Sequence, residues 1–375
     1  MAGIYFHIPF CLKKCHYCDF YSRSDPNGID EIIQAEIQEL ILRKEYIGDE
    51  IVETIYFGGG TPSLLDVKHI TLLLNCVKNI FDVSTDCEIT FEANPDDLSE
   101  VYLADLYNCG INRLSIGIQS FNDDVLKFLG RRHDSKKLNY IIDIGKGIGF
   151  DNISIDLIFG IPGFDTSVYL ASLKSAIQLN IQHISAYSLT IAEGTLFYKR
   201  FKNNKLSEIN EDILVDQFNQ TIDFLALNGF NHYEISNYAK DGFKSLHNSS
   251  YWDDVTYLGI GPSAHSYNQL SRQWNVSNSK QYCAKIKESK SFFEVEYLTP
   301  KDKFNEYLII GLRTSNGISK KFVFDNFDDK IWLHFSRELD KLFEQKLVCL
   351  VGENIVLTRK GILISDFILR NLYFV

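Results

Sequence analysis

The 375-residue sequence lacks any apolar run that approaches 18 residues, the length that a membrane-spanning helix requires. It also lacks a basic excess, because 49 acidic side chains outnumber 38 basic ones and the formal net charge is -11. A nucleic-acid-binding protein usually presents a basic surface, so this balance argues against nucleic acid as a partner. The first residues carry neither the basic nor the apolar stretch of a signal peptide, which predicts a cytoplasmic location.

Disulfides are not expected among the eight cysteines, because the cytosol is reducing. Three of them crowd into residues 11–18. Cys76, Cys87, Cys109 and Cys349 instead lie in apolar stretches, where a cysteine usually packs as a small core residue. Apolar residues make up 45% of the chain, which is enough for a large core. The cysteine cluster near the start of the chain is therefore the feature to explain.

Short segments rich in Ile, Phe and Tyr alternate with amphipathic segments in the first half of the chain. The predicted strands are residues 4–7, 54–57, 88–92, 113–118, 153–158 and 184–189. The predicted helices are residues 29–46, 64–81, 98–109, 136–147 and 168–179. Successive βα units imply a parallel sheet, and six units are fewer than the eight of a closed TIM barrel. The sequence therefore predicts an α/β fold, an open, partial (β/α)6 TIM-like barrel with its chemistry at the carboxyl ends of the strands.

The alternation fades after about residue 195. Residues 198–246 are predicted to be mostly helical and residues 247–274 to be rich in loops. A helix at 330–345 followed by a hairpin within 347–357 indicates an α+β, winged-helix-like unit, and the acidity of the chain favours structural packing over DNA binding for it. The predicted domains are the partial barrel at 1–195, a connecting region at 196–298 and the winged-helix-like domain at 299–375.

The strongest local signal is the Cys-x3-Cys-x2-Cys motif of Cys11, Cys15 and Cys18, directly after the first predicted strand. Three thiolates from one loop suit an iron–sulfur cluster or zinc. Structural zinc prefers four protein ligands, and His7 and His16 would supply unusual spacings, so zinc is the lesser alternative. A [4Fe-4S] cluster with three protein ligands leaves one iron open to chelate S-adenosylmethionine. One electron from the cluster then breaks a carbon–sulfur bond and gives a 5'-deoxyadenosyl radical, which is the chemistry of the cofactor.

Polar or glycine-rich residues follow the carboxyl ends of the next predicted strands, where ligand-binding residues collect in such barrels. A glycine run after the second strand lets the backbone approach a ligand closely. Glu92 and Asp156 suit ribose hydroxyls and the ammonium group, Arg131 can meet a carboxylate with two hydrogen bonds, and Tyr17 would lie over the adenine. The residues of this predicted S-adenosylmethionine site are Tyr17, Gly59, Gly60, Thr61, Glu92, Gln119, Arg131 and Asp156.

Together these residues resemble the oxygen-independent coproporphyrinogen III oxidase-like family of radical S-adenosylmethionine (radical SAM) proteins, over nearly the whole chain. The similar segments are residues 5–11, 58–63, 92–95, 113–121, 156–160, 233–239 and 258–261. The resemblance implies that Tyr5 contacts S-adenosylmethionine, together with most of the residues already named.

The family contains oxidases, which make protoporphyrinogen IX from coproporphyrinogen III, and a branch of haem chaperones. The oxidases carry a fourth cysteine two places after the third, where this sequence has Phe20. They also have a long segment before the cluster loop, where only ten residues precede Cys11 here. Residues 247–252, His-Asn-Ser-Ser-Tyr-Trp, are similar to the haem-binding motif of the chaperone branch.

This motif also suits haem on chemical grounds. An imidazole is a common axial ligand of haem iron, and Tyr251 and Trp252 offer flat apolar surface to a porphyrin. His247 is therefore the predicted haem ligand, with His265 as the alternative.

The resulting hypothesis is a haem chaperone that binds a [4Fe-4S] cluster, S-adenosylmethionine and haem. It would pass haem to acceptor haemoproteins, with respiratory enzymes, at the membrane or elsewhere, as the expected class, and it would need a reductant for the cluster. The alternatives are an oxygen-independent coproporphyrinogen III oxidase and a radical SAM enzyme with another substrate. Whether the chain is an enzyme stays open, and no catalytic residue is assigned.

Overall fold

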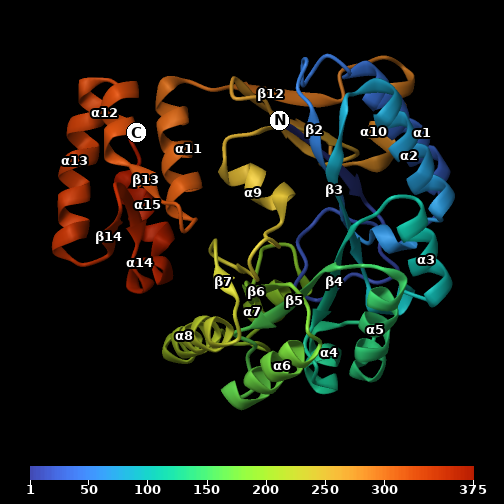
Figure 1. Ribbon diagram of the computed structural model, residues 1–375, viewed down its shortest axis with the longest axis horizontal. Helices are drawn as coiled ribbons and strands as arrows, with labels where there is room; N and C mark the ends of the chain where they lie inside the picture. Colours follow the sequence, from blue (N-terminus) through green and yellow to red (C-terminus); the bar gives the residue numbers. More distant parts are fainter.

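The computed structural model describes residues 1–375 and contains a 12-stranded and a 3-stranded sheet (Figure 1). Neighbouring parallel strands form the centre of the larger sheet: β1 (Ala2–Ile8), β2 (Val52–Gly59), β3 (Val83–Ala93), β4 (Arg113–Gln119), β5 (Asn152–Phe159) and β6 (His183–Ser188). The helices that connect them are α1 (Ile29–Leu42), α2 (Val67–Ile80), α3 (Glu100–Asn108), α4 (Asp123–Leu129), α5 (Leu138–Ile148) and α6 (Thr166–Gln178). The predicted α/β class, its six strands and the helices between them are confirmed.

Along these strands, residues that pack in the apolar core alternate with residues that face the other side of the sheet. On β1, Ile4, Phe6 and Ile8 are fully buried in the large apolar core, which the helices also line. The residues between them on β1 are Tyr5 and His7, which point to the other face of the sheet. The helices thus cover the outer face of the curved sheet. The other face of the sheet lines the interior of the partial barrel.

The prediction that residues 247–274 are rich in loops is wrong. This segment forms α9 (Leu246–Trp252), β9 (Thr256–Ile260), β10 (His265–Tyr267) and most of β11 (Ser271–Asn275). Strand β9 pairs with β1 in parallel, so the sheet continues past its first strand. A Cβ atom on Gly259 would collide with the carbonyl oxygen of His265, so the glycine permits close strand pairing and does not mark a loop.

The helical prediction for residues 198–246 is partly right. The segment contains the end of α7 (Leu196–Lys202) and all of α8 (Glu211–Leu227), but then forms β7 (Asn231–His232) and β8 (Asn237–Ala239). These two strands extend the other edge of the sheet beyond β6, while α10 (Ser279–Lys287) and β12 (Phe293–Tyr297) complete the β9 side. Short 3-10 turns occur at η1 (Pro62–Leu64), η2 (Pro95–Asp97) and η3 (Ser135–Lys137).

The C-terminal region has its own apolar core of 16 buried residues. Its elements are α11 (Pro300–Leu312), β13 (Ile318–Ser319), α12 (Lys320–Asn326), α13 (Asp329–Glu344), β14 (Val348–Val351), β15 (Asn354–Leu357), α14 (Arg359–Leu363) and α15 (Ser365–Leu372). A helix followed by a hairpin is present, as predicted for a winged-helix-like unit. The domain boundaries at 195 and 298 stay predictions.

No helix of the protein has the length and apolarity to cross a membrane.

Candidate cofactor-binding site

The cysteine motif forms a loop at the carboxyl end of β1, anchored from both sides. The Cys11 amide donates to the Arg23 carbonyl at 3.0 Å, and the Arg23 amide donates to the Pro9 carbonyl at 2.8 Å. The His16 amide donates to the Leu129 carbonyl at 3.0 Å, and the Phe197 amide donates to the His16 carbonyl at 2.9 Å. The loop is therefore held by α4 and α7 as well as by its own return segment.

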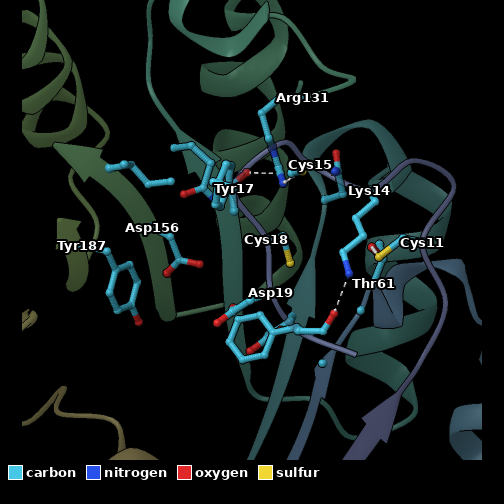
Figure 2. Close-up of a pocket in the computed structure, with 18 of the residues that line it drawn as sticks. Cys11, Lys14, Cys15, Tyr17, Cys18, Asp19, Thr61, Arg131, Asp156 and Tyr187 are labelled. Atoms are coloured by element: carbon cyan, nitrogen blue, oxygen red, sulfur yellow. Dashed lines mark hydrogen bonds between the residues drawn. The ribbon is translucent and has the colours of Figure 1, made fainter. Parts of the chain in front are cut away.

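A cavity of about 510 Å³ opens beside this loop at the carboxyl ends of the strands (Figure 2). Cys11 and Thr61 lie on one side of it, and Asp156 and Tyr187 lie on the other. All predicted site residues except Tyr5 and His247 line this cavity: Cys11, Cys15, Tyr17, Cys18, Gly59, Gly60, Thr61, Glu92, Gln119, Arg131 and Asp156. Residues from four strands, β2 to β5, and from the loops after β1, β2 and α4 are thus brought together as the strand-end pattern predicted.

The glycine run after β2 allows the cysteine loop to approach the sheet. A Cβ atom on Gly60 would lie 2.6 Å from the carbonyl oxygen of Phe10 and 2.8 Å from that of Ile8, distances that a side chain cannot occupy. The neighbouring Thr61 hydroxyl donates to the Cys11 sulfur at 3.3 Å. The glycine run therefore places a hydroxyl donor next to a thiol.

Two glycines allow Arg131 to reach the cavity, one by turning the backbone and the other by leaving space. Helix α4 ends at Gly130, whose φ of 78° is in the left-handed region that favours glycine. The Arg131 guanidinium then donates to the Cys15 sulfur at 3.4 Å and to the Gly117 carbonyl at 2.6 Å. A Cβ atom on Gly117 would lie 3.2 Å from this guanidinium and 3.0 Å from the Gln119 amide nitrogen, so the missing side chain makes room for both.

Gln119 adopts a backbone conformation that is uncommon outside glycine, with a φ of 67°. The pairing of β4 with β5 shifts register between Ile116 and Gln119. This irregularity ends the strand and leaves the Gln119 side chain on the cavity wall. Strained residues of this kind collect at binding sites.

Two carboxyl groups on the cavity wall are shielded from water. Burial raises the pKa of Glu92 to about 7, against a lowering by the hydrogen bond that the Tyr56 hydroxyl donates to it at 2.8 Å. Burial also raises the pKa of Asp156 to about 6, against a lowering by Ser185 and by the Arg113 guanidinium. Both groups can therefore accept hydrogen bonds as carboxylates near neutral pH, where Glu92 is close to half ionised.

The thiols are free, and burial raises the pKa of the Cys18 thiol to about 11. No group of three or more His, Cys, Asp or Glu side chains is arranged to hold a single metal ion. His16 Nδ1 bonds the Phe128 carbonyl and His7 Nε2 bonds the Tyr21 carbonyl, so both histidines of the zinc alternative have other partners. Three thiols that converge on a cavity, two with hydrogen-bond donors on their sulfurs, fit a cubane cluster, in which each thiolate binds a different iron.

His247 lies away from the cavity and is only 1% exposed. Its Nδ1 bonds the Thr54 hydroxyl at 2.8 Å, and its Nε2 bonds the Tyr251 hydroxyl at 2.9 Å. Burial, with the positive charge of Arg113, lowers its pKa to about 3. His247 is thus a neutral, fully bonded core histidine in this conformation, whereas the alternative His265 is exposed at the start of β10.

Tyr5 also lies outside the cavity lining, with its hydroxyl 3.3 Å from His7 Nδ1 and its ring stacked near His247. Other residues that line the cavity were not predicted from the sequence, among them Lys14, Asn94, Ser115, Arg132 and Tyr187. Tyr56, whose hydroxyl donates a hydrogen bond to Glu92, was not predicted either. For Ser115 and Tyr187, which lie on strands, alternation was the available signal, because residues two places apart on a strand share a face, as Ser115 does with Gly117.

Comparisons with known proteins agree with this architecture. The Radical SAM superfamily model matches residues 5–173, and the HemN C-terminal domain model matches residues 298–364. The structure is similar to that of coproporphyrinogen III oxidase (HemN) from Escherichia coli, with a TM-score of 0.86, 24% identity, and coverage of 99% of this chain and 90% of that chain. This likeness shows a common fold, that of a radical SAM protein with a HemN-type C-terminal domain.

The chain is more similar in sequence to a group of curated relatives than to HemN. The chain is 34% identical to heme chaperone HemW of Bacillus subtilis (strain 168), with coverage of 98% of this chain and 97% of the relative. It is 38% identical to heme chaperone HemW of Escherichia coli (strain K12), with coverage of 70% and 69%. The chain belongs to the HemW family of radical SAM proteins, and this superfamily implies a [4Fe-4S] cluster and S-adenosylmethionine.

Proposed function

We propose that this protein is a haem chaperone, which carries a [4Fe-4S] cluster and S-adenosylmethionine, binds haem and passes it to acceptor haemoproteins. The observation that carries this proposal is the similarity, over nearly the whole chain, to relatives named heme chaperone HemW. Phe20 supports it, because it stands where the oxidases of the wider family have a fourth cysteine.

Within this proposal, Cys11, Cys15 and Cys18 hold the cluster. The cofactors, once bound, supply the reductive cleavage of a carbon–sulfur bond. The chain's own contribution is placement and electrostatics. The hydroxyl of Thr61 and the guanidinium of Arg131 donate to sulfur atoms and thereby stabilise negative charge on them.

The remaining cavity residues are proposed to bind S-adenosylmethionine. Arg131 meets the carboxylate, since its guanidinium is buried beside the cysteine loop and its Nε has no hydrogen-bond partner. Glu92 and Asp156 accept hydrogen bonds from the ribose hydroxyls or the ammonium group. Tyr17 covers the adenine, and Tyr5 supports the floor of the site from β1.

Haem is proposed to bind through the α9 motif, with His247 as the iron ligand. Because both ring nitrogens of His247 are bonded and buried, ligation requires α9 to move out of its place against the barrel. His265 is the second candidate, because it is exposed without any rearrangement. The other proposed partners are a one-electron reductant and acceptor haemoproteins in the cytoplasm or at the membrane, and the net charge of -11 argues against nucleic acid.

An anaerobic comparison of two activities tests the function. The reconstituted protein is titrated with haem and, in parallel, supplied with coproporphyrinogen III, S-adenosylmethionine and a reductant. The chaperone proposal expects about one haem per chain, no protoporphyrinogen, and weaker haem retention with a shifted Soret band in His247→Ala. Steady formation of protoporphyrinogen would favour the oxidase instead. An unchanged spectrum in His247→Ala would move the ligand to His265.

A further inference from the structure

The haem motif and the cofactor cavity share one tyrosine. The Tyr56 ring, only 8% exposed, stacks on the His247 ring with centroids 5.0 Å apart and planes inclined by 28°. Its hydroxyl donates to Glu92 Oε1 at 2.8 Å. Glu92 lines the cavity, whereas His247 belongs to α9. A single side chain on β2 thus contacts both sites.

Helix α9 is held tightly in this position. The amides of Leu246 and His247 each donate to the Glu88 carboxylate at 3.0 Å. A Cβ atom on Gly3 would lie 2.9 Å from the Thr54 hydroxyl and 3.3 Å from the His247 ring, so β1 and the helix leave no room between them. Because close-packed interiors do not deform gradually, the helix either keeps this place or leaves it.

We propose that Tyr56 is a positioning residue that fixes Glu92 in the cofactor cavity, and that it couples haem bound through α9 to S-adenosylmethionine bound at Glu92. The coupling rests on the proposed haem function. The hydrogen bond from Tyr56 to Glu92 is independent of haem, and its test rests on the proposed S-adenosylmethionine site alone. When haem draws the His247 ring away, Tyr56 loses the surface on which it stacks, and Glu92 loses its fixed hydrogen bond. Haem therefore weakens S-adenosylmethionine binding, and by reciprocity S-adenosylmethionine promotes haem release.

The ionisation of Glu92 distinguishes a positioning role of Tyr56 from general packing, because only the positioning role predicts a change in the pH dependence of S-adenosylmethionine affinity. The titratable or charged groups that face Glu92 are Tyr5, Tyr56, Arg113, Asp156, Tyr187 and Tyr251. Of these, only Tyr56 donates a hydrogen bond to the carboxylate. Burial raises the pKa of Glu92 to about 7, and removal of this donor raises that pKa further. If the carboxylate form binds S-adenosylmethionine, the affinity rises with pH, and its midpoint moves upward in Tyr56→Phe.

The first arm of the test contains no haem. S-adenosylmethionine affinity is measured against pH for the anaerobically reconstituted full chain, for Tyr56→Phe and for the control Tyr102→Phe. Tyr102 is a partly buried tyrosine whose hydroxyl donates to the Leu65 carbonyl. We expect Tyr56→Phe to bind about tenfold more weakly at neutral pH and to show the higher midpoint, with Tyr102→Phe unchanged. Wild-type affinity and midpoint in Tyr56→Phe would overturn the positioning role.

The second arm repeats the measurement with saturating haem. We expect haem to weaken S-adenosylmethionine binding by about fivefold or more in the wild type, and by less than about twofold in Tyr56→Phe. If the wild type binds haem and its S-adenosylmethionine affinity is unchanged, the coupling is wrong and the chaperone function stands. If the wild type binds no haem, the proposed function fails and the coupling fails with it, while the first arm still decides the role of Tyr56.

Discussion

Three thiols, a threonine hydroxyl and a guanidinium meet at one end of the cavity. The thiols come from a single loop, and the two donors come from other parts of the chain. Such donors stabilise thiolates and tune the cluster that they bind. The proposed ligands of the cluster are therefore distinct from the residues that support them.

The ligands are tested by removing each thiol. Cys11→Ala, Cys15→Ala and Cys18→Ala should each lose the content of about four iron and four sulfide per chain, because a three-ligand cluster has no spare thiolate. The measurement is iron and sulfide analysis after anaerobic reconstitution. Cys76→Ala is the control and should keep the cluster, since Cys76 packs against the apolar core. Stoichiometric zinc without sulfide in the wild type would contradict the assignment.

Arg131 is tested by its effect on S-adenosylmethionine. Arg131→Ala should weaken binding by roughly tenfold to a hundredfold, because a charge-assisted contact contributes about 1.5–3 kcal/mol. Arg131→Lys, which keeps the charge and loses the forked geometry, should lie between that variant and the wild type. The readout is anaerobic calorimetry on protein of equal cluster content. Arg337→Ala, on the exposed face of α13, is the control, and equal losses in both variants would argue against a direct contact.

Much of the cavity could be predicted from the sequence because its residues sit at strand ends. The cysteines, Glu92, Arg131 and Asp156 all line it. Tyr56 could not be found in this way, because it lies inside β2 and acts through Glu92. The environment of His247 was equally hidden, since its partners Thr54 and Tyr251 become visible only when α9 is placed against the sheet.

At the scale of elements, the strands carry two patterns at once. Their outward residues are apolar and pack under the helices, while their inward residues form polar contacts with neighbouring strands and with α9. Ser154 bonds His183 Nδ1 at 2.7 Å, and Thr54 bonds His247 Nδ1 at 2.8 Å. The six central strands were predictable from their apolar character. Strand β9 was not, because Gly259 within it resembles a loop residue until the partner strand is known.

The cysteine loop approaches β2 so closely that Gly60 has no room for a side chain. Gly60→Ala would place a Cβ atom 2.6 Å from the Phe10 carbonyl oxygen, so the loop must move and cluster content should fall. Gly147→Ala is the matched control, because this position in α5 has no atom within 4 Å of an added Cβ. It should raise the free energy of unfolding by about 0.5–1 kcal/mol. Full cluster content in Gly60→Ala would refute the steric argument.

At the scale of the molecule, the C-terminal region has a core of its own beside the barrel (Figure 1). Phe335 is fully buried in that core, so Phe335→Ala should destabilise the region by about 3–5 kcal/mol while the cluster stays in place. Thermal unfolding followed by circular dichroism and by cluster absorbance separates the two events. Leu333→Ala, at a 67% exposed position of the same helix, should change the stability by less than about 0.5 kcal/mol. Simultaneous loss of both signals in Phe335→Ala would mean that the two cores unfold together.

A haem chaperone must deliver haem to an acceptor, and a transfer experiment tests this. Haem-loaded, reconstituted protein is mixed with the haem-free form of a respiratory cytochrome, and the absorption spectrum of the cytochrome is followed over time. In a parallel control, haem-loaded serum albumin replaces the protein as the haem donor at the same haem concentration. A chaperone that recognises its acceptor transfers haem faster than this non-specific carrier, and loss of haem by the donor matches gain by the acceptor. Transfer no faster than from albumin, with the cluster intact, would contradict the account.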